Sequence, residues 1–336
     1  SILIMFINTL EITRIIDQQE TNFSKFLYLL FLKIPNIMSE SMPFVIVISI
    51  AFLLRNLITN NELISIRNIG LSIIDVFKPI SISILLFGLF NLFFINPISA
   101  KFEKQFDILT SKNYSDIYSI KLIDKELWIK NIADINTKKI INISEIDLGN
   151  MNAKNIKIFD KNNYANKIFI AEKGSISNKN FLLNNEKIYN LNNDLITNKN
   201  EFNIKINFDR EGIIDSISNY KFIPFYKYHQ HIDNLKKFNL HSSEVSLFYI
   251  SEILKPIFLV MIGFVVMGFS GKFKRNESFF KVLFISILIG FLIFLHKELV
   301  ITLTTSINLS YIFSYFIIFI FPFFIGLYKM INIESD

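Results

Sequence analysis

The 336-residue chain contains no cysteine, which excludes thiolate nucleophiles, iron–sulfur clusters, cysteine-ligated zinc and a disulfide-stapled secreted module. Only 19% of its residues are charged and 51% are hydrophobic, with a mean hydropathy of +0.40. Soluble domains rarely combine such values. The apolar residues gather in long runs near both ends, around a middle rich in Asn, Lys and Asp. The pattern excludes a disordered chain and a single globular domain, and it predicts a polytopic membrane protein with a water-facing insert.

Six apolar segments are candidates for membrane spans, since a spanning helix needs about 20 mostly apolar residues. They are residues 1–16, 41–57, 79–95, 253–269, 279–295 and 307–327. We interpret the first as the remainder of a helix rather than a signal peptide, because no basic segment precedes it and no small-residue cleavage site follows it. An amphipathic stretch over residues 23–39 extends the second. The prediction is therefore three spans on each side of the hydrophilic insert.

Lysine and arginine in short loops predict the orientation of the spans. Two loops that fall on one side of a six-span protein are basic: Arg55, Arg67 and Lys78 precede span three, and Lys272, Lys274, Arg275 and Lys281 precede span five. That side is expected to be the cytoplasm. The insert after the third span then lies outside and the C-terminus lies inside.

The middle of the chain, from Lys101 to Ser218, has a period of two instead of the helical period. Short β-rich runs are separated by Asn- and Asp-containing breaks; they are residues 127–132, 139–143, 155–160 and 201–208. Residues 167–176 and 181–183 are typical of one hairpin. The spacing predicts an antiparallel sandwich or jelly roll.

The sequence shows no recognisable set of catalytic residues. The stretch from Gly263 to Gly268 resembles a phosphate-binding loop, but Phe269 and Ser270 follow where Lys and Ser or Thr are needed. If ATP is used, a partner must hydrolyse it. We expect no enzyme activity and no cofactor.

A pair of histidines, His229 and His231, lies near Asp233. On a strand, such a pair would present two ring nitrogens on one face, as a metal site needs. Without a third well-placed ligand it is more often a solvated surface, and we expect no metal.

Three charged residues in the first segment, Glu11, Arg14 and Asp17, have helical spacing. Charges at membrane depth are costly, by about 2.5–3.5 kcal/mol each, and often mark substrate paths. They can equally form a pair at the helix end whose side chains reach the headgroups. An arginine there suits a phosphorylated amphiphile, because a guanidinium binds phosphate through two hydrogen bonds.

The loop over residues 60–72 is predicted to form a short helix. Asn60 or Asn61 would cap it, Glu62 occupies its favourable first turn and Gly70 would end it. The helix would carry an apolar stripe made of Leu63, Ile66 and Ile69, with Glu62 and Arg67 beside it. Such a helix either lies on lipid or docks a cytoplasmic protein, and the spacing alone leaves both open.

Two lysines, Lys101 and Lys104, follow Pro97 at the outer end of the third span. They serve either as anchors that reach the headgroups or as cations that hold lipid phosphates.

The order of three spans, outer β domain and three spans resembles LptF and LptG, the permease subunits of the bacterial lipopolysaccharide exporter. Residues 61–72 resemble the family's coupling-helix motif, and residues 14–18 resemble the end of the first span of LptG. Residues 127–130, which contain Trp128, are similar to the Leu-Trp start of its β domain. Residues 251–256 resemble the segment that leads into its fourth span. The similarity covers nearly the whole chain and favours LptG over LptF.

The resemblance implies an inner-membrane subunit that works with a homologous LptF-like permease, a cytoplasmic LptB-like ATPase dimer and a periplasmic LptC/LptA-like bridge. It implies three regions, at residues 1–100, 101–235 and 236–336, with the coupling helix at about 60–72. Its substrate is lipopolysaccharide, and the implied contacts to it are Arg14, Lys101 and Lys104. The implied docking residues for the ATPase are Glu62, Leu63, Ile66, Arg67 and Gly70.

Three other readings of the sequence stay open. A membrane-anchored sensor would bind a ligand with the β domain, although such proteins usually carry a recognisable cytoplasmic output domain. An intramembrane enzyme would need a catalytic constellation within the spans. A lipoprotein exporter typically has four spans, with its outer domain after the first. Counting the spans on each side of the insert distinguishes these cases.

Overall fold

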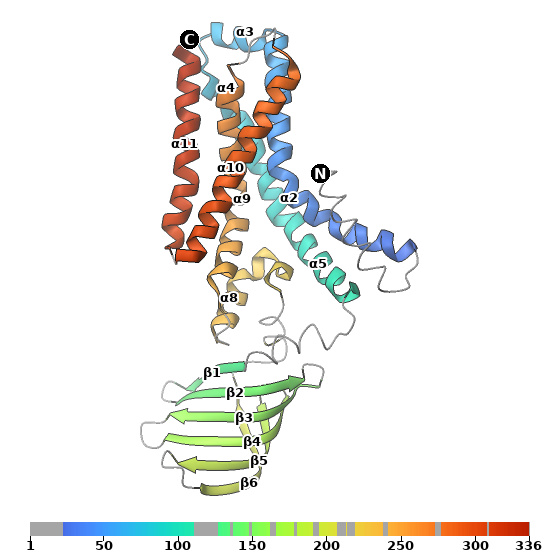
Figure 1. Cartoon of the computed structure of the whole chain (residues 1–336), viewed down its shortest axis with the longest axis vertical. Coiled ribbons are helices and arrows are strands. Elements are labelled where there is room, and N and C mark those ends of the chain that lie inside the picture. Colours follow the sequence, from blue (N-terminus) through green and yellow to red (C-terminus); the bar gives the residue numbers. More distant parts are fainter. Residues whose placement is uncertain are drawn as a thin grey trace. The chain divides into compact units, whose positions relative to one another are not determined.

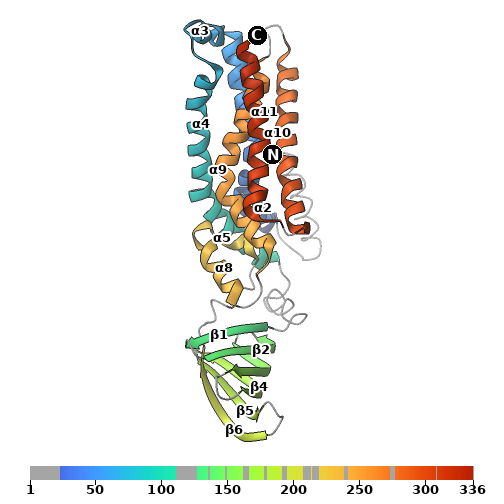
Figure 2. The same cartoon turned by 90° about the vertical axis from the view of Figure 1, so that its left-hand side faces the viewer.

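The computed structural model describes most of the chain. The described residues are 23–110, 127–134, 137–147, 150–161, 166–177, 180–190, 195–206, 213, 219–237, 241–272, 277–307 and 309–335. The chain divides into two compact units, one of Ser1–Glu103 with Ser243–Asp336 and one of Lys104–Ser242. The first unit contains a bundle of long helices, and the second contains an antiparallel sheet (Figures 1 and 2).

Five helices in the described residues are long and apolar enough to cross a membrane. The helical elements are α2 (Phe23–Thr59), α3 (Glu62–Asn68), α4 (Ile73–Phe90), the π-helix η1 (Asn91–Ile95), α5 (Asn96–Thr110), α9 (Ser243–Ser270), α10 (Phe279–Ile307) and α11 (Tyr311–Ser335). The elements α4, η1 and α5 run on without a break and count as one of the five. The first predicted span, residues 1–16, lies outside the described residues.

The other predicted spans are shorter than the helices that contain them. The amphipathic stretch 23–39 is part of α2, as predicted, but the third span runs on to Thr110 and the fourth begins already at Ser243. Ile307, predicted to begin the last span, is instead the last residue of α10. Helices continue beyond the apolar window because adding a residue to a formed helix costs far less than starting one.

The centre of the bundle is α9, which contacts α2, α4, α10 and α11. Small residues let its neighbours approach closely, as is usual between membrane helices. A Cβ added at Gly88 of α4 would lie 2.7 Å from Pro256 Cα of α9, and one at Gly263 would lie 2.8 Å from Ile84 Cδ1. These contacts hold the second half of α4 closely against α9.

The sheet unit contains six strands in the order β1-β2-β3-β4-β5-β6, each antiparallel to the next. Their bounds are β1 (Leu127–Asp134), β2 (Thr137–Asp147), β3 (Asn152–Lys161), β4 (Asn166–Ser177), β5 (Asn180–Asn190) and β6 (Leu195–Lys205). The predicted hairpin is confirmed, since Ile176 pairs with Phe181. The described strands form one sheet in simple sequence order, whereas a jelly roll has two sheets joined by Greek-key connections.

One face of the sheet carries its core. Ile141 and Ile143 of β2 and Ile156 and Ile158 of β3 are at most 1% exposed, and Phe181 of β5 is fully buried. Each pair is two residues apart, as burial on one face of a strand requires. The same unit contains the short 3-10 helices η2 (Tyr220–Phe222) and η3 (Phe225–Lys227) and the helix α8 (Tyr228–Lys237).

Candidate functional site

The predicted short helix over residues 60–72 is present as α3, between α2 and α4 (Figure 1). Asn61 is its N-cap residue but has left-handed backbone angles, with φ of 58°, and its side chain makes no capping hydrogen bond to a described residue. Among the described residues, Asn61 therefore occupies the N-cap position as predicted, without the side-chain hydrogen bond that usually accompanies it. Gly70 has φ of +88°, which favours glycine and ends the helix as predicted.

A second cap, which was not predicted from the sequence, follows directly. Ser72 Oγ accepts a hydrogen bond from Asp75 N at 3.1 Å, and Asp75 Oδ2 accepts one from Ser72 N at 3.0 Å. This capping box fixes the start of α4 two residues after Gly70. A serine three positions before an aspartate, at the start of an apolar run, is the signal that would have revealed it. The chain thus reverses direction at α3 in a defined way.

The predicted stripe on α3 is only partly correct. Leu63 is buried, at 6% exposure, and Ile66 is half-buried, whereas Ile69 is 78% exposed. Leu63 therefore anchors α3 on the bundle, and Ile69 lies beyond the helix end, where it no longer follows the helical period. Glu62 and Ile64 are exposed and available to a partner.

Arg67 ties α3 to the last helix of the bundle. Its Nη2 donates a hydrogen bond to the carbonyl of Ile333 in α11 at 3.0 Å. A cation is favourable there, because the carbonyls near a helix C-terminus carry partial negative charge and lack intrahelical partners. Ile333 is itself buried, and a Cβ added at Gly271 would meet its Cδ1 at 3.0 Å. Arg67 therefore links α3 to the packed ends of α9 and α11.

The two predicted lysines both lie on α5, where Lys101 is exposed and Lys104 is half-buried. Residues three apart on a helix face the same side. Between them, Glu103 forms an ion pair with Lys33 of α2 at 3.1 Å. Arg14, the third predicted substrate contact, lies outside the described residues.

A polar cluster inside the bundle was not predicted. Lys255 Nζ of α9 donates to Ser39 Oγ of α2 at 2.7 Å and pairs with Glu252 at 3.1 Å. Ser39 Oγ donates in turn to Asn91 Oδ1 at 3.2 Å. Asn96 Nδ2 donates to Glu252 Oε2 at 3.4 Å. We call Ser39, Asn91, Asn96, Glu252 and Lys255 the polar cluster.

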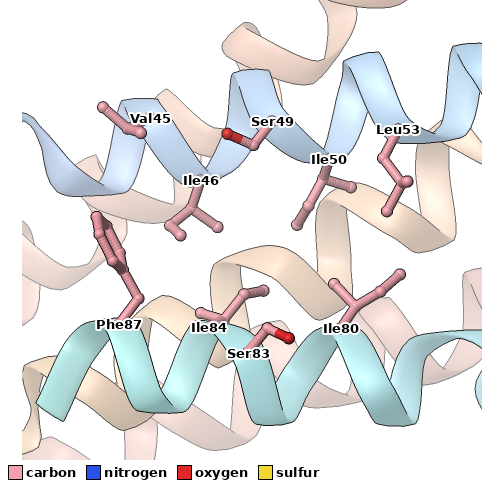
Figure 3. Close-up of a pocket in the computed structure, with 9 residues that line it drawn as sticks. All are labelled: Val45, Ile46, Ser49, Ile50, Leu53, Ile80, Ser83, Ile84 and Phe87. Atoms are coloured by element: carbon pink, nitrogen blue, oxygen red, sulfur yellow. The ribbon is translucent and has the colours of Figure 1, made fainter. Parts of the chain in front are cut away.

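An apolar cavity of about 300 Å³ lies between α2 and α4. Figure 3 shows Ile46 and Ile50 of α2 pointing toward Ile84 and Phe87 of α4. The lining residues are Val45, Ile46, Ser49, Ile50, Leu53, Ile80, Ser83, Ile84 and Phe87. A cavity with this lining suits a hydrocarbon chain and offers almost no polar groups for orientation.

The two histidines are not placed on a strand, the arrangement that was considered for a metal site and not expected to hold one. They lie on α8 rather than on a strand, and residues two apart on a helix point to different sides. His229 is exposed and lies 3.5 Å from Asp233, while His231 is buried. Among the described residues, no three His, Asp or Glu side chains are grouped so as to hold a metal.

The long apolar helices and the antiparallel sheet define a multi-pass membrane protein with a β domain. The chain matches the model of the lipopolysaccharide export system permease LptF/LptG over residues 1–332. It therefore belongs to that family of permeases, whose members are the membrane subunits of a transporter and are not themselves catalytic. No curated protein matches the chain.

Proposed function

We propose that the chain is the LptG-like subunit of an ATP-driven exporter that takes lipopolysaccharide from the inner membrane and passes it to a periplasmic bridge of β jelly rolls. The observation that carries the proposal is α3, a short helix between two spans that is anchored by Leu63 and exposes Glu62. A soluble ATPase can bind such a helix and shift the permease from one of two conformations toward the other. The choice of LptG over LptF rests on Arg14 and Trp128.

The partners follow from what this chain would need. Its sequence contains no phosphate-binding loop, so a cytoplasmic ATPase dimer would hydrolyse ATP while docked on α3 through Glu62, Leu63, Ile66, Arg67 and Gly70. A homologous LptF-like permease would complete the path for the lipid. An LptC- or LptA-like protein would continue the β structure on the other side.

The proposed orientation places α3 and the C-terminus in the cytoplasm and residues 101–235 in the periplasm. Its support is the concentration of Lys and Arg in the loops on the α3 side, since cytoplasmic loops carry an excess of these residues. Residues 1–100 and 236–336 form the two membrane regions on either side of the periplasmic one.

The proposed substrate contacts combine charge with apolar surface. Arg14, Lys101 and Lys104 would meet lipid phosphates, and the cavity between α2 and α4 would take part of an acyl chain. Keeping acyl chains out of water is worth about 25 cal/mol per Å² of buried surface. An apolar lining therefore lowers the cost of moving a many-chained lipid.

The docking role is tested by purifying the tagged chain at native expression in a detergent that preserves complexes. We expect a second permease and a soluble ATPase to be recovered with the wild type. We expect Glu62→Ala to lose the ATPase and keep the permease. Glu277→Ala is a matched control, because it removes a carboxylate from the neighbouring loop, where it pairs with Lys281 at 2.8 Å. Equal recovery of the ATPase with Glu62→Ala and wild type would refute the docking role.

A further inference from the structure

The third membrane helix changes its hydrogen-bonding pattern at one place. The π-helix η1 covers Asn91–Ile95, and Asn96 N donates to Asn91 O, five residues earlier. Pro97, which follows directly, lacks the N–H that a regular α-helix would use. Single π-turns and prolines re-aim the helix that follows, and they occur often at functional sites. The direction of α5 is thus set at η1.

Close packing holds the helix rigidly on one side of this turn. Gly88 lies directly against the backbone of Pro256, so α4 cannot shift toward α9. On the other side, Lys33 of α2 pairs with Glu103 of α5, and the rings of Phe31 and Phe102 lie 5.7 Å apart. The helix therefore has a fixed part, a turn and an outer part that rests on α2.

The polar cluster contacts both ends of the turn. Lys255 reaches Asn91 through the hydroxyl of Ser39, and Glu252 accepts from Asn96 just beyond the turn. The Lys255 and Glu252 side chains are only 14% and 17% exposed. Hydrogen bonds to charged groups in such surroundings are stronger than those between neutral groups. The first residue of the turn and the residue directly after it are thus both connected to one ion pair on α9.

One hydrogen-bond donor in the polar cluster has no acceptor among the described residues. Asn91 is 1% exposed, and its Nδ2 has no partner among the described residues. A buried donor without a partner destabilises the arrangement that contains it. A different turn at this position, which gave Nδ2 a partner, would therefore compete with the one seen here.

We propose that Lys255 and Glu252 are positioning residues that hold the π-turn, and that the turn sets where α5 stands against α2. This role goes beyond the proposed export function, and its test needs neither lipid substrate nor partner.

When the ion pair holds Ser39, Asn91 and Asn96, the contact between Phe31 and Phe102 stays closed. When it is removed, α5 leaves α2 more often.

The experiment uses the absence of native cysteine. The full chain carrying Phe31→Cys and Phe102→Cys, in lipid nanodiscs, has two thiols, and the rate of reaction with a short thiol-reactive cross-linker reports how often α5 lies against α2. We expect Lys255→Met to slow cross-linking about tenfold, the effect of losing one hydrogen bond to a charged group. Lys255→Arg keeps the cation and should restore most of the rate. Lys281→Met removes an exposed lysine of an i, i+4 pair and should leave the rate unchanged.

A cross-linking rate that is the same in Lys255→Met and wild type would overturn the proposal, as would a rate that falls equally in Lys281→Met. If Lys255→Met is not monodisperse, Ser39→Ala decides instead, because it breaks the connection to Asn91 and leaves the ion pair of Lys255 and Glu252 in place. Slower cross-linking in a monodisperse Ser39→Ala chain would support the proposal, and an unchanged rate would overturn it.

Discussion

Two glycines of the bundle test how tightly α4, α9 and α2 are packed. Gly88 and Gly263 both lie inside helices, so replacing either with alanine gains about 1 kcal/mol of helix propensity. At Gly88 the new methyl group would meet Pro256 Cα at 2.7 Å, a backbone atom that cannot move alone. At Gly263 it would meet the terminal methyl groups of Ile84 and Ile50, at 2.8 and 2.9 Å.

The two isoleucines have room to give way, because both line the cavity of about 300 Å³ between α2 and α4 (Figure 3). We therefore expect Gly263→Ala to leave stability unchanged or slightly higher. Overpacking against a rigid neighbour costs about 1–3 kcal/mol, so Gly88→Ala should destabilise by up to about 2 kcal/mol after the gain in propensity. At about 2–4 °C per kcal/mol, the two midpoints should differ by several degrees.

The assay is thermal unfolding of the full chain in detergent, followed by circular dichroism at 222 nm. Wild type, Gly88→Ala and Gly263→Ala are compared in the same preparation. A midpoint for Gly263→Ala that is as low as that of Gly88→Ala would mean that the isoleucines cannot move into the cavity. The description of the packing would then be refuted.

Two further substitutions have defined outcomes. Arg67→Ala removes the hydrogen bond to Ile333 O and should speed amide hydrogen exchange in the last turns of α11, with a loss of about 1 kcal/mol or less because Arg67 is exposed; exchange that is unchanged there would exclude the link. Phe181→Ala empties a fully buried site in the sheet and should cost about 3–5 kcal/mol. Limited proteolysis should then cut the sheet unit well before the helices, and equal resistance in the variant would contradict the assigned core.

The features that the sequence predicts well are those that repeat along the chain. The period of two located the strands, because burial on one face of a sheet selects every second residue, as at Ile141 and Ile143. Apolar runs located the five spans in the described residues, because a helix that crosses a bilayer needs about 20 mostly apolar residues. Their ends were missed because residues such as Ser243 and Thr110 continue a helix without being apolar.

The polar cluster could not be found from the sequence. Ser39, Asn91 and Lys255 lie on three different elements, far apart along the chain, and no local pattern marks their contact. The link from Arg67 to Ile333 is equally distant in the sequence. Arg14 lies outside the described residues, so its role stays a prediction.

The most direct test of the account measures lipopolysaccharide transfer from vesicles that contain the chain, its partner permease and the ATPase to a periplasmic bridge protein. We predict transfer only with ATP, none when this chain is omitted, and a strong loss with Glu62→Ala but not with Glu277→Ala. ATP-dependent transfer that continues without the chain, or at the wild-type rate with Glu62→Ala, would contradict the assignment of this protein as the coupled permease.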